Sequence, residues 1–159
     1  MKPTQQLHDL GQSIWLDNIT RGLLTSGTLR RYIGDFSVTG LTSNPSIFDL
    51  AIRNSSLYDD AIRRKAIEGK SGERLFFELA IEDLAQAADL FRPVHDATAG
   101  MDGWVSLEVS PLLAHDTAST IKAAAQLHAQ RTGPISSSRF RERAKGWPRL
   151  RKASLPEYR

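Results

Sequence analysis

The segment that most constrains this chain is Val38-Thr39-Gly40-Leu41-Thr42-Ser43-Asn44-Pro45-Ser46-Ile47-Phe48. Its apolar start predicts a short strand over 38–42, and the polar corner that follows leads into a helix. Pro45 disfavours helical angles at the preceding residue, so Asn44 should be extended with its amide projecting from the end of the strand. Ser46 is placed to cap a helix that starts near Ile47. An ordinary strand-to-helix turn would have the same features.

Two other segments repeat this arrangement. Ile14-Trp15-Leu16 predicts a strand over 13–16 that ends at Asp17, and the apolar segment from Trp104 to Val109 carries Glu108 near its end. A helical stretch follows each of the three strands. A βα barrel builds its active site from polar side chains at the carboxyl ends of successive parallel strands. The sequence therefore predicts an α/β fold with its site at one edge of a parallel sheet.

The apolar spacing between the strands predicts the helices. Two short helices should follow the first strand, separated by Ser26-Gly27, with Thr28 as the cap of the second. Further helices are expected over 46–51, 56–65, 71–91 and 117–129. Phe91 and Pro93 should end the long helix, because proline interrupts helical hydrogen bonding. The residues expected on its inner side are all apolar: Leu75, Leu79, Leu84, Ala87 and Ala88.

Three sequence segments resemble transaldolases, in particular the bacterial branch with Trp-Leu-Asp-Asn and Thr-Ser-Asn-Pro signatures. They are Gln12-Ser13-Ile14-Trp15-Leu16-Asp17-Asn18-Ile19, Leu41-Thr42-Ser43-Asn44-Pro45-Ser46-Ile47-Phe48 and Asp102-Gly103-Trp104-Val105-Ser106-Leu107-Glu108-Val109. The resemblance runs in order over roughly residues 8–133. It implies the first three βα units of a TIM (β/α)8 barrel, since a complete barrel takes about 250 residues.

The resemblance also implies an activity, the Schiff-base transfer of a dihydroxyacetone unit between sugar phosphates in the non-oxidative pentose phosphate pathway. A lysine forms the Schiff base and a carboxylate moves protons, without a metal or cofactor. By resemblance, Asp17 is the acid/base and Glu108 orients a water molecule. Asn44 would bind the dihydroxyacetone unit, and Thr42 and Ser43 would help to orient it. Sugar phosphates are the expected partners.

Simpler structural interpretations stay open for the two carboxylates. Asp17 precedes Asn-Ile-Thr and could cap the next helix. Glu108 could be a solvated strand end. For His115 and Asp116, which resemble a helix-opening pair of the family, we expect packing or capping. The four histidines show no metal-ligand spacing.

The resemblance places the Schiff-base lysine on a fourth strand, in a segment like L-F-I-K-I-P-G-T after Ala129. The chain has no such segment, and its lysines are not on apolar strands: Lys2, Lys65, Lys70, Lys122, Lys145 and Lys152. A nucleophilic lysine needs a desolvated environment to lower its pKa. We therefore expect the chain to be inactive alone. Codons for Ile135–Arg143 can be chosen so that an overlapping frame reads L-F-I-K-I-P-G-T, which suggests a frameshift near Arg131–Pro134.

The charge distribution marks the same boundary. Residues 134–159 hold eight Lys/Arg against Glu142 and Glu157, a net charge of +6, whereas residues 1–133 have a net charge of −3. We expect residues 1–133 to form the barrel portion and 134–159 a disordered, out-of-frame basic tail. An alternative is a non-catalytic module that binds nucleic acid through this tail, with Phe140, Trp147 and Tyr158 stacking on bases.

A second alternative, another Schiff-base aldolase with a shorter barrel, is disfavoured by the Trp-Leu-Asp-Asn and Trp-Val-Ser-Leu-Glu segments. Cysteine is absent, which excludes disulfides and thiolate metal sites. No apolar run approaches the roughly 18 residues of a membrane span, and the N-terminus lacks a signal-peptide core. We expect a cytoplasmic protein.

Overall fold

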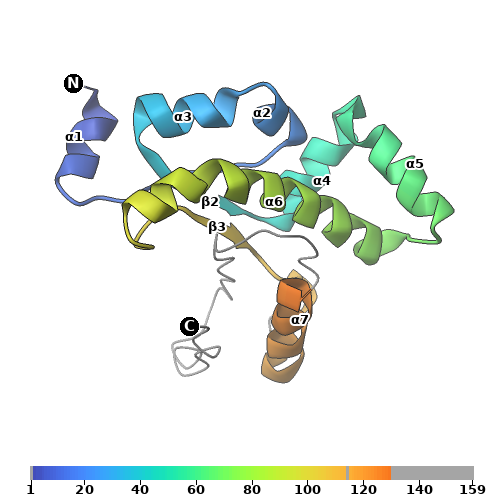
Figure 1. The fold of residues 1–159 in the computed structure, drawn as a ribbon. Helices are drawn as coiled ribbons and strands as arrows, with labels where there is room; N and C mark the ends of the chain where they lie inside the picture. The colour runs from blue at the N-terminus through green and yellow to red at the C-terminus, as the bar shows by residue number, and fades with distance from the viewer. Residues whose placement is uncertain (1, 114, 130–159) are drawn as a thin grey trace.

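The computed structural model describes residues 2–113 and 115–129, so the basic tail predicted over 134–159 lies outside the described residues. Helices and strands alternate along the described chain (Figure 1). In order, the elements are α1 (Pro3–Asp9), β1 (Ile14–Asp17), α2 (Arg21–Thr25), α3 (Thr28–Phe36), β2 (Val38–Ser43), α4 (Pro45–Arg53), η1 (Ser56–Tyr58), α5 (Asp59–Ile67), α6 (Gly72–Ala97), β3 (Trp104–Leu107), η2 (Pro111–Leu113) and α7 (Thr117–Ala129). Among the described helices, none combines the length and apolarity needed to cross a bilayer.

The three strands form one parallel sheet in the order β1-β2-β3. Asp17 is paired with Thr42, which is in turn paired with Ser106. The neighbouring row pairs Leu16 with Leu41 and Leu41 with Val105. Parallel strands joined through helices are the expected building units of an α/β fold. The predicted α/β class is confirmed, and the sheet is consistent with part of a TIM barrel.

One face of the sheet packs against helices. Leu41, Val105 and Leu107 are almost fully buried in a single apolar core. The helix α6 contributes the largest share of the facing side chains, namely Ala80, Leu84, Ala87, Ala88 and Phe91. The helices α2, α3 and α6 contact one another and form the layer over this face (Figure 1). Burying these apolar side chains drives the helices onto the sheet.

The start of α4 differs from the prediction in its capping residue. Asn44 is extended, with φ −130° and ψ 159°, as Pro45 requires. The helix begins at Pro45, and the Asn44 side chain, not that of Ser46, accepts a hydrogen bond from the Ile47 N–H at 3.0 Å. Proline at the first helical position loses no intrahelical bond, which favours this earlier start. The prediction that Ser46 is the cap was wrong.

The N-cap residues of the two short helices are Thr20 and Gly27, and the second differs from the prediction. Thr20 caps α2, because its hydroxyl accepts from the Leu23 N–H at 3.0 Å. Gly27, rather than Thr28, precedes the first residue of α3, with a left-handed φ of 77°. Glycine adopts this angle without the steric cost that a side chain would bring. The prediction that Thr28 is the cap was therefore wrong.

The helix α6 continues six residues past Phe91 to Ala97 and includes Pro93. The predicted end at Phe91 and Pro93 was wrong because packing stabilises the last turns. Phe91 is fully buried, and the His95 ring makes an edge-to-face contact with Trp104 at 5.7 Å. At Gly103 a side chain would collide with the His95 backbone. These contacts offset the hydrogen bond that Pro93 removes.

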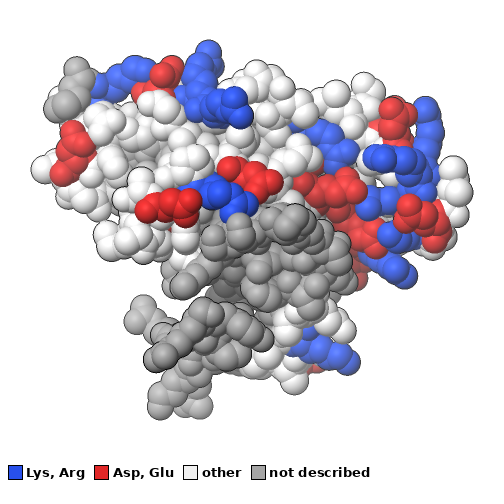
Figure 2. All heavy atoms as spheres, viewed as in Figure 1, with Lys and Arg blue, Asp and Glu red and all other residues white. Residues whose placement is uncertain are grey.

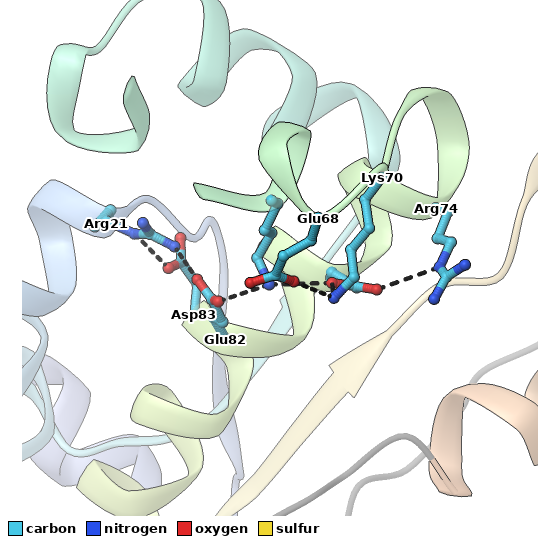
Figure 3. A network of polar contacts seen from close by, with 8 residues as sticks. Arg21, Glu68, Lys70, Arg74, Glu82 and Asp83 are labelled. Carbon is cyan, nitrogen blue, oxygen red and sulfur yellow. Dashed lines mark hydrogen bonds and ion pairs between the residues drawn. The ribbon is translucent and has the colours of Figure 1, made fainter. Parts of the chain in front are cut away.

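A charged network joins α2, α5 and α6 (Figure 3), and Tyr58 of η1 is hydrogen-bonded to it. At its centre is Asp83, whose side chain is fully buried in the middle of α6. Its carboxylate accepts hydrogen bonds from the Arg21 Nε at 2.8 Å and from the Tyr58 hydroxyl at 2.7 Å. The Tyr58 oxygen also accepts from the Arg21 backbone N–H at 2.8 Å. Burial raises the pKa of Asp83, and burial together with the charge of Asp83 raises that of Tyr58.

The network continues outward to the exposed end of α6. Lys65 bridges Glu82 at 2.9 Å and Glu78 at 3.1 Å, and Lys70 bridges Glu78 at 2.7 Å and Glu68 at 2.9 Å. Acidic and basic side chains alternate around α5 and the start of α6 instead of forming a patch of one sign (Figure 2). Burial disfavours the charge on Glu78, but hydrogen bonds from Lys70 and Lys65 lower its pKa overall.

We predict that Asp83→Asn lowers the free energy of unfolding by about 3 kcal/mol, because it breaks a buried ion pair and leaves the Arg21 guanidinium only the partly exposed Glu82, at 3.0 Å, as a charged partner. Asp60→Asn is the matched control, since Asp60 pairs with Arg63 at 3.3 Å on the exposed surface. Its expected cost is within about 0.5 kcal/mol. Urea unfolding measures both. Equal stability losses in the two variants would contradict the central role of Asp83.

The lowered pKa of Glu78 predicts a pH dependence of stability. A carboxylate with a lowered folded-state pKa stabilises the fold above its unfolded pKa of about 4.3, and this contribution is lost as pH falls through the folded value. Glu78→Gln should therefore destabilise the chain at pH 7 and flatten the loss of stability below about pH 4.3. Glu73→Gln, an exposed change on the same helix, is the control. If the free energy of unfolding falls equally steeply with pH in wild type and in Glu78→Gln, this linkage is excluded.

Candidate functional site

Three polar side chains lie in one row across the carboxyl-terminal part of the sheet. Strand pairing places Asp17 of β1 beside Thr42 of β2, and Thr42 beside Ser106 of β3. Paired residues on parallel strands point to the same face, and neighbouring strands are about 4.8 Å apart. We call Asp17, Thr42 and Ser106 the polar row. Its face is opposite the one that α6 covers, because Leu41, Val105 and Leu107 alternate with its members.

Asn44 and Glu108 continue this face beyond the ends of the strands. Each comes two residues after a member of the polar row, Thr42 and Ser106 respectively. Since side chains alternate with a period of two along extended backbone, both positions belong to the same side of the sheet. Asn44 and Glu108 are half-buried. The structure thus brings four of the five predicted site residues to one face and one edge.

Asp17 is the exposed member of the polar row. Because the Thr20 hydroxyl caps α2, the alternative in which Asp17 caps this helix is wrong. Within the described chain, the Asp17 carboxylate has neither a hydrogen-bond donor nor a cation as a partner. Its oxygens are therefore available to an external group.

Asn44 and Ser43 have structural contacts that bear on their predicted roles. The Asn44 Oδ1 accepts from the Ile47 N–H at the start of α4, which fixes the side-chain amide and leaves its NH₂ group as the donor toward a ligand. Ser43 is fully buried, and its hydroxyl donates to the Ser106 carbonyl oxygen at 3.0 Å. As the neighbour of Thr42 along the strand, Ser43 points to the opposite face. The structure does not bring Ser43 into the polar row.

An aromatic row lies next to the polar row on the same face. Gly40 is paired with Trp15 on one side and with Trp104 on the other. A side chain at Gly40 would lie 2.5 Å from the Trp15 ring, so the absence of one lets the indole lie across β2. The Trp104 indole N–H is directed to the Gly100 carbonyl oxygen at 3.1 Å. The polar row is therefore bordered by apolar ring surface toward the amino ends of the strands.

Two other predicted features fall elsewhere. Asp116 caps α7 as expected, accepting from the Ser119 N–H at 3.0 Å, and hydrogen bonds from Ser119 lower the Asp116 pKa. The neighbouring His115 is exposed. The aromatic residues proposed for nucleic-acid stacking lie outside the described residues: Phe140, Trp147 and Tyr158.

Sequence reasoning did not select Ser106, although its position two residues before Glu108 on a strand was a usable signal. It also missed the Arg21–Asp83 pair, because an aspartate within an amphipathic helix pattern does not reveal its burial.

The described lysines lie away from the strands. Lys65 and Lys70 are held by glutamates of the charged network, Lys2 lies 3.8 Å from Asp35, and Lys122 is exposed on α7.

The sequence is similar to known transaldolases over most of its length. Residues 14–138 match the family described as Transaldolase/Fructose-6-phosphate aldolase. The chain is 52% identical over 126 residues to a Transaldolase from Arthrobacter sp. (strain FB24), covering 79% of this chain and 34% of that protein. It is 45% identical over 127 residues to one from Thiobacillus denitrificans (strain ATCC 25259 / T1), covering 80% and 35%.

A Transaldolase from Trichodesmium erythraeum (strain IMS101) is 42% identical over 119 residues, covering 75% of this chain and 31% of that protein. The chain thus spans about a third of the length of these curated relatives. Family match, sequence identity and the parallel βα arrangement agree with one another. On these grounds the chain belongs to the transaldolase/fructose-6-phosphate aldolase family.

Proposed function

We propose that this chain supplies one side of a transaldolase active site. The reaction transfers a dihydroxyacetone unit from sedoheptulose 7-phosphate to glyceraldehyde 3-phosphate and yields erythrose 4-phosphate and fructose 6-phosphate. The observation that carries the proposal is the alignment of Asp17 with Thr42 on the face that also carries Asn44 and Glu108. In a chain of this family, that edge corresponds to the active-site end of a βα barrel.

Asp17 is the proposed acid/base. Aldol cleavage removes a proton from a substrate hydroxyl as the carbon–carbon bond breaks, and addition to the acceptor returns a proton to the new hydroxyl. A carboxylate can do this only if an oxygen reaches the substrate. The exposure of Asp17 and its position at the end of β1 meet that requirement.

Glu108 is proposed to orient the water molecule that relays protons, and Asn44 to bind the dihydroxyacetone unit. The Asn44 amide suits this role because its Oδ1 is already held by the Ile47 N–H, so the NH₂ group is fixed in direction. A donor held in place before binding loses little entropy when the ligand arrives. Thr42 adds a hydroxyl from the centre of the row. Ser43 is fully buried and donates to the Ser106 carbonyl oxygen of β3, so its proposed contribution is to hold β2 and β3 together and not to contact the substrate.

Schiff-base chemistry requires a lysine that the described residues do not bring to this edge. Lys65 and Lys70 form ion pairs with glutamates, and hydrogen bonds to Glu82 and Glu78 raise the pKa of Lys65 despite its partial burial. A raised pKa disfavours the neutral amine that attacks a carbonyl. We infer that residues 1–133 do not catalyse the transfer alone. Because codons for Ile135–Arg143 can be chosen that encode L-F-I-K-I-P-G-T in an overlapping frame, we propose a frame change near Arg131–Pro134, and sequencing the coding DNA from Gln126 to Arg159 tests it.

A chimaera tests the proposed function. We expect no transaldolase activity from this chain alone, and activity once residues 1–129 are joined to the part of the Arthrobacter relative that follows its matched region. In the active chimaera, Asp17→Asn should lower kcat at least about 100-fold, the usual range for a lost general acid/base. Asp35→Asn, an exposed change on α3, should leave kcat unchanged. The assay follows erythrose 4-phosphate formation.

An active chimaera in which Asp17→Asn and Asp35→Asn have the same kcat would refute the role of Asp17. A folded chimaera without activity would refute the broader proposal that this chain supplies a competent side of the site. Circular dichroism and a cooperative thermal transition establish that the chimaera is folded before either conclusion is drawn.

A further inference from the structure

The loop that joins α6 to β3 contains an Asp-Gly pair, Asp102-Gly103, which occurs once in the sequence. In such a pair the glycine amide nitrogen can attack the aspartate side-chain carboxyl and close a succinimide ring, because glycine has no side chain to hinder the approach. Packing requires the glycine here, since Gly103 has a φ of 81° and a side chain would collide with the His95 backbone. The fold thus places a reactive neighbour directly after Asp102.

Both reacting groups are held by hydrogen bonds in the folded chain. The Gly103 N–H donates to the Thr39 carbonyl oxygen of β2 at 2.7 Å. Asp102 is buried, and its carboxylate accepts from the Ser13 hydroxyl at 2.6 Å. The Asp102 N–H donates to the Thr98 hydroxyl at 3.0 Å. Ring closure requires the nitrogen to leave Thr39 and the carboxyl group to leave Ser13, so the reaction needs a local opening of this corner.

Ser13 is the contact of this corner that lies nearest to the surface. It is exposed and directly precedes β1, which is an edge strand of the sheet in the described chain. Segments with few buried contacts open at a lower free energy than the core does. Release of the Asp102 carboxylate by Ser13 is therefore the expected first step of opening.

We propose that Asp102-Gly103 is a modification site at which isoaspartate forms when Ser13 releases the Asp102 carboxyl group. The Gly103 nitrogen gives up its proton and bonds to the Asp102 Cγ, from which one oxygen leaves as water. A second water molecule then adds to the main-chain carbonyl carbon of Asp102 and breaks its bond to the Gly103 nitrogen. Overall no atoms are gained or lost, but the main chain now runs through the aspartate side chain. This chemistry is independent of the proposed catalytic role.

The modified chain does not rebuild this corner. Isoaspartate adds one carbon to the main chain before Gly103, whose backbone packs directly against that of His95. The added length displaces the Gly103 N–H from the Thr39 carbonyl oxygen, and the former main-chain carbonyl of Asp102 becomes a free carboxylate. Isoaspartate formation thus makes a transient opening between β1 and the start of β3 permanent.

The test ages the full-length chain at neutral pH, either in native buffer or in urea, and then digests it with endoproteinase Asp-N. This protease cleaves the Met101–Asp102 bond before aspartate but not before isoaspartate. Wild type should react at least about tenfold more slowly in native buffer than in urea, because the reaction needs opening. Ser13→Ala should raise the native rate about tenfold through loss of one hydrogen bond to a carboxylate. Ser119→Ala is the matched control, since the Ser119 hydroxyl donates to the Asp116 carboxylate at 2.7 Å.

Ser119→Ala should leave the rate at Asp102 unchanged, and Ser13→Thr, which keeps a hydroxyl, should react as wild type does. Four results would overturn the inference: no isoaspartate in urea, equal wild-type rates in native buffer and urea, equal native rates in wild type and Ser13→Ala, or equal increases in Ser13→Ala and Ser119→Ala. A cooperative urea transition establishes that each variant is folded, and the wild-type comparison requires no variant.

Discussion

The parallel pairing of β2 with both of its neighbours is the constraint on which the rest of the structure depends. Because β2 is central, one register fixes Asp17 beside Thr42 and Thr42 beside Ser106. The same register sends Leu41, Val105 and Leu107 into the core under α6. A shift of one residue in either pair would exchange the two faces and bury the polar side chains. Burial of the apolar face therefore also determines the geometry of the candidate site.

The helices are held in place by a different kind of interaction. Asp83 in the middle of α6 joins Arg21 at the start of α2 to Tyr58 in η1, all by bonds of 2.8 Å or less. A buried charge is costly unless it is paired and hydrogen-bonded, so this centre tolerates few alternative arrangements of the three helical segments. Since Arg21 follows Thr20 at the end of the β1 loop, the network also anchors the chain just beyond Asp17.

Sequence patterns predicted the strands and most helices because each has a strong local signal. The spans of β1, β2 and β3 agree with prediction within two residues at each end, and α7 has the predicted bounds. The errors arose where several groups compete. Asn44 and Ser46 could both cap α4, and the fixed angle of Pro45 favours Asn44. The continuation of α6 through Pro93 depends on contacts made by β3, which local spacing does not contain.

The candidate site was predictable to the same extent. The sequence identified Asp17 and Glu108 because both follow apolar strand segments. Once the strands are taken to be parallel, their position along the chain places both residues at the same edge of the sheet. Period-two alternation puts Ser43 on the helix-packed face and Ser106 on the face of Glu108, but only the register shows that Ser106 lies beside Thr42. Sequence motifs thus located the edge, whereas the pairing of strands decided which of its side chains share a face.

The most direct test of this account is the distance between β1 and β3 on the site face. The chain has no cysteine, so nitroxide labels at Asp17→Cys and Glu108→Cys would be the only ones. Asp17 and Glu108 are separated by two strand spacings of about 4.8 Å across the sheet and by two residues, about 6.6 Å, along the strand direction. At this short separation the double-labelled chain should show strong dipolar broadening relative to the single-labelled chains. Spectra that equal the sum of the single-labelled chains would contradict the register and, with it, the site.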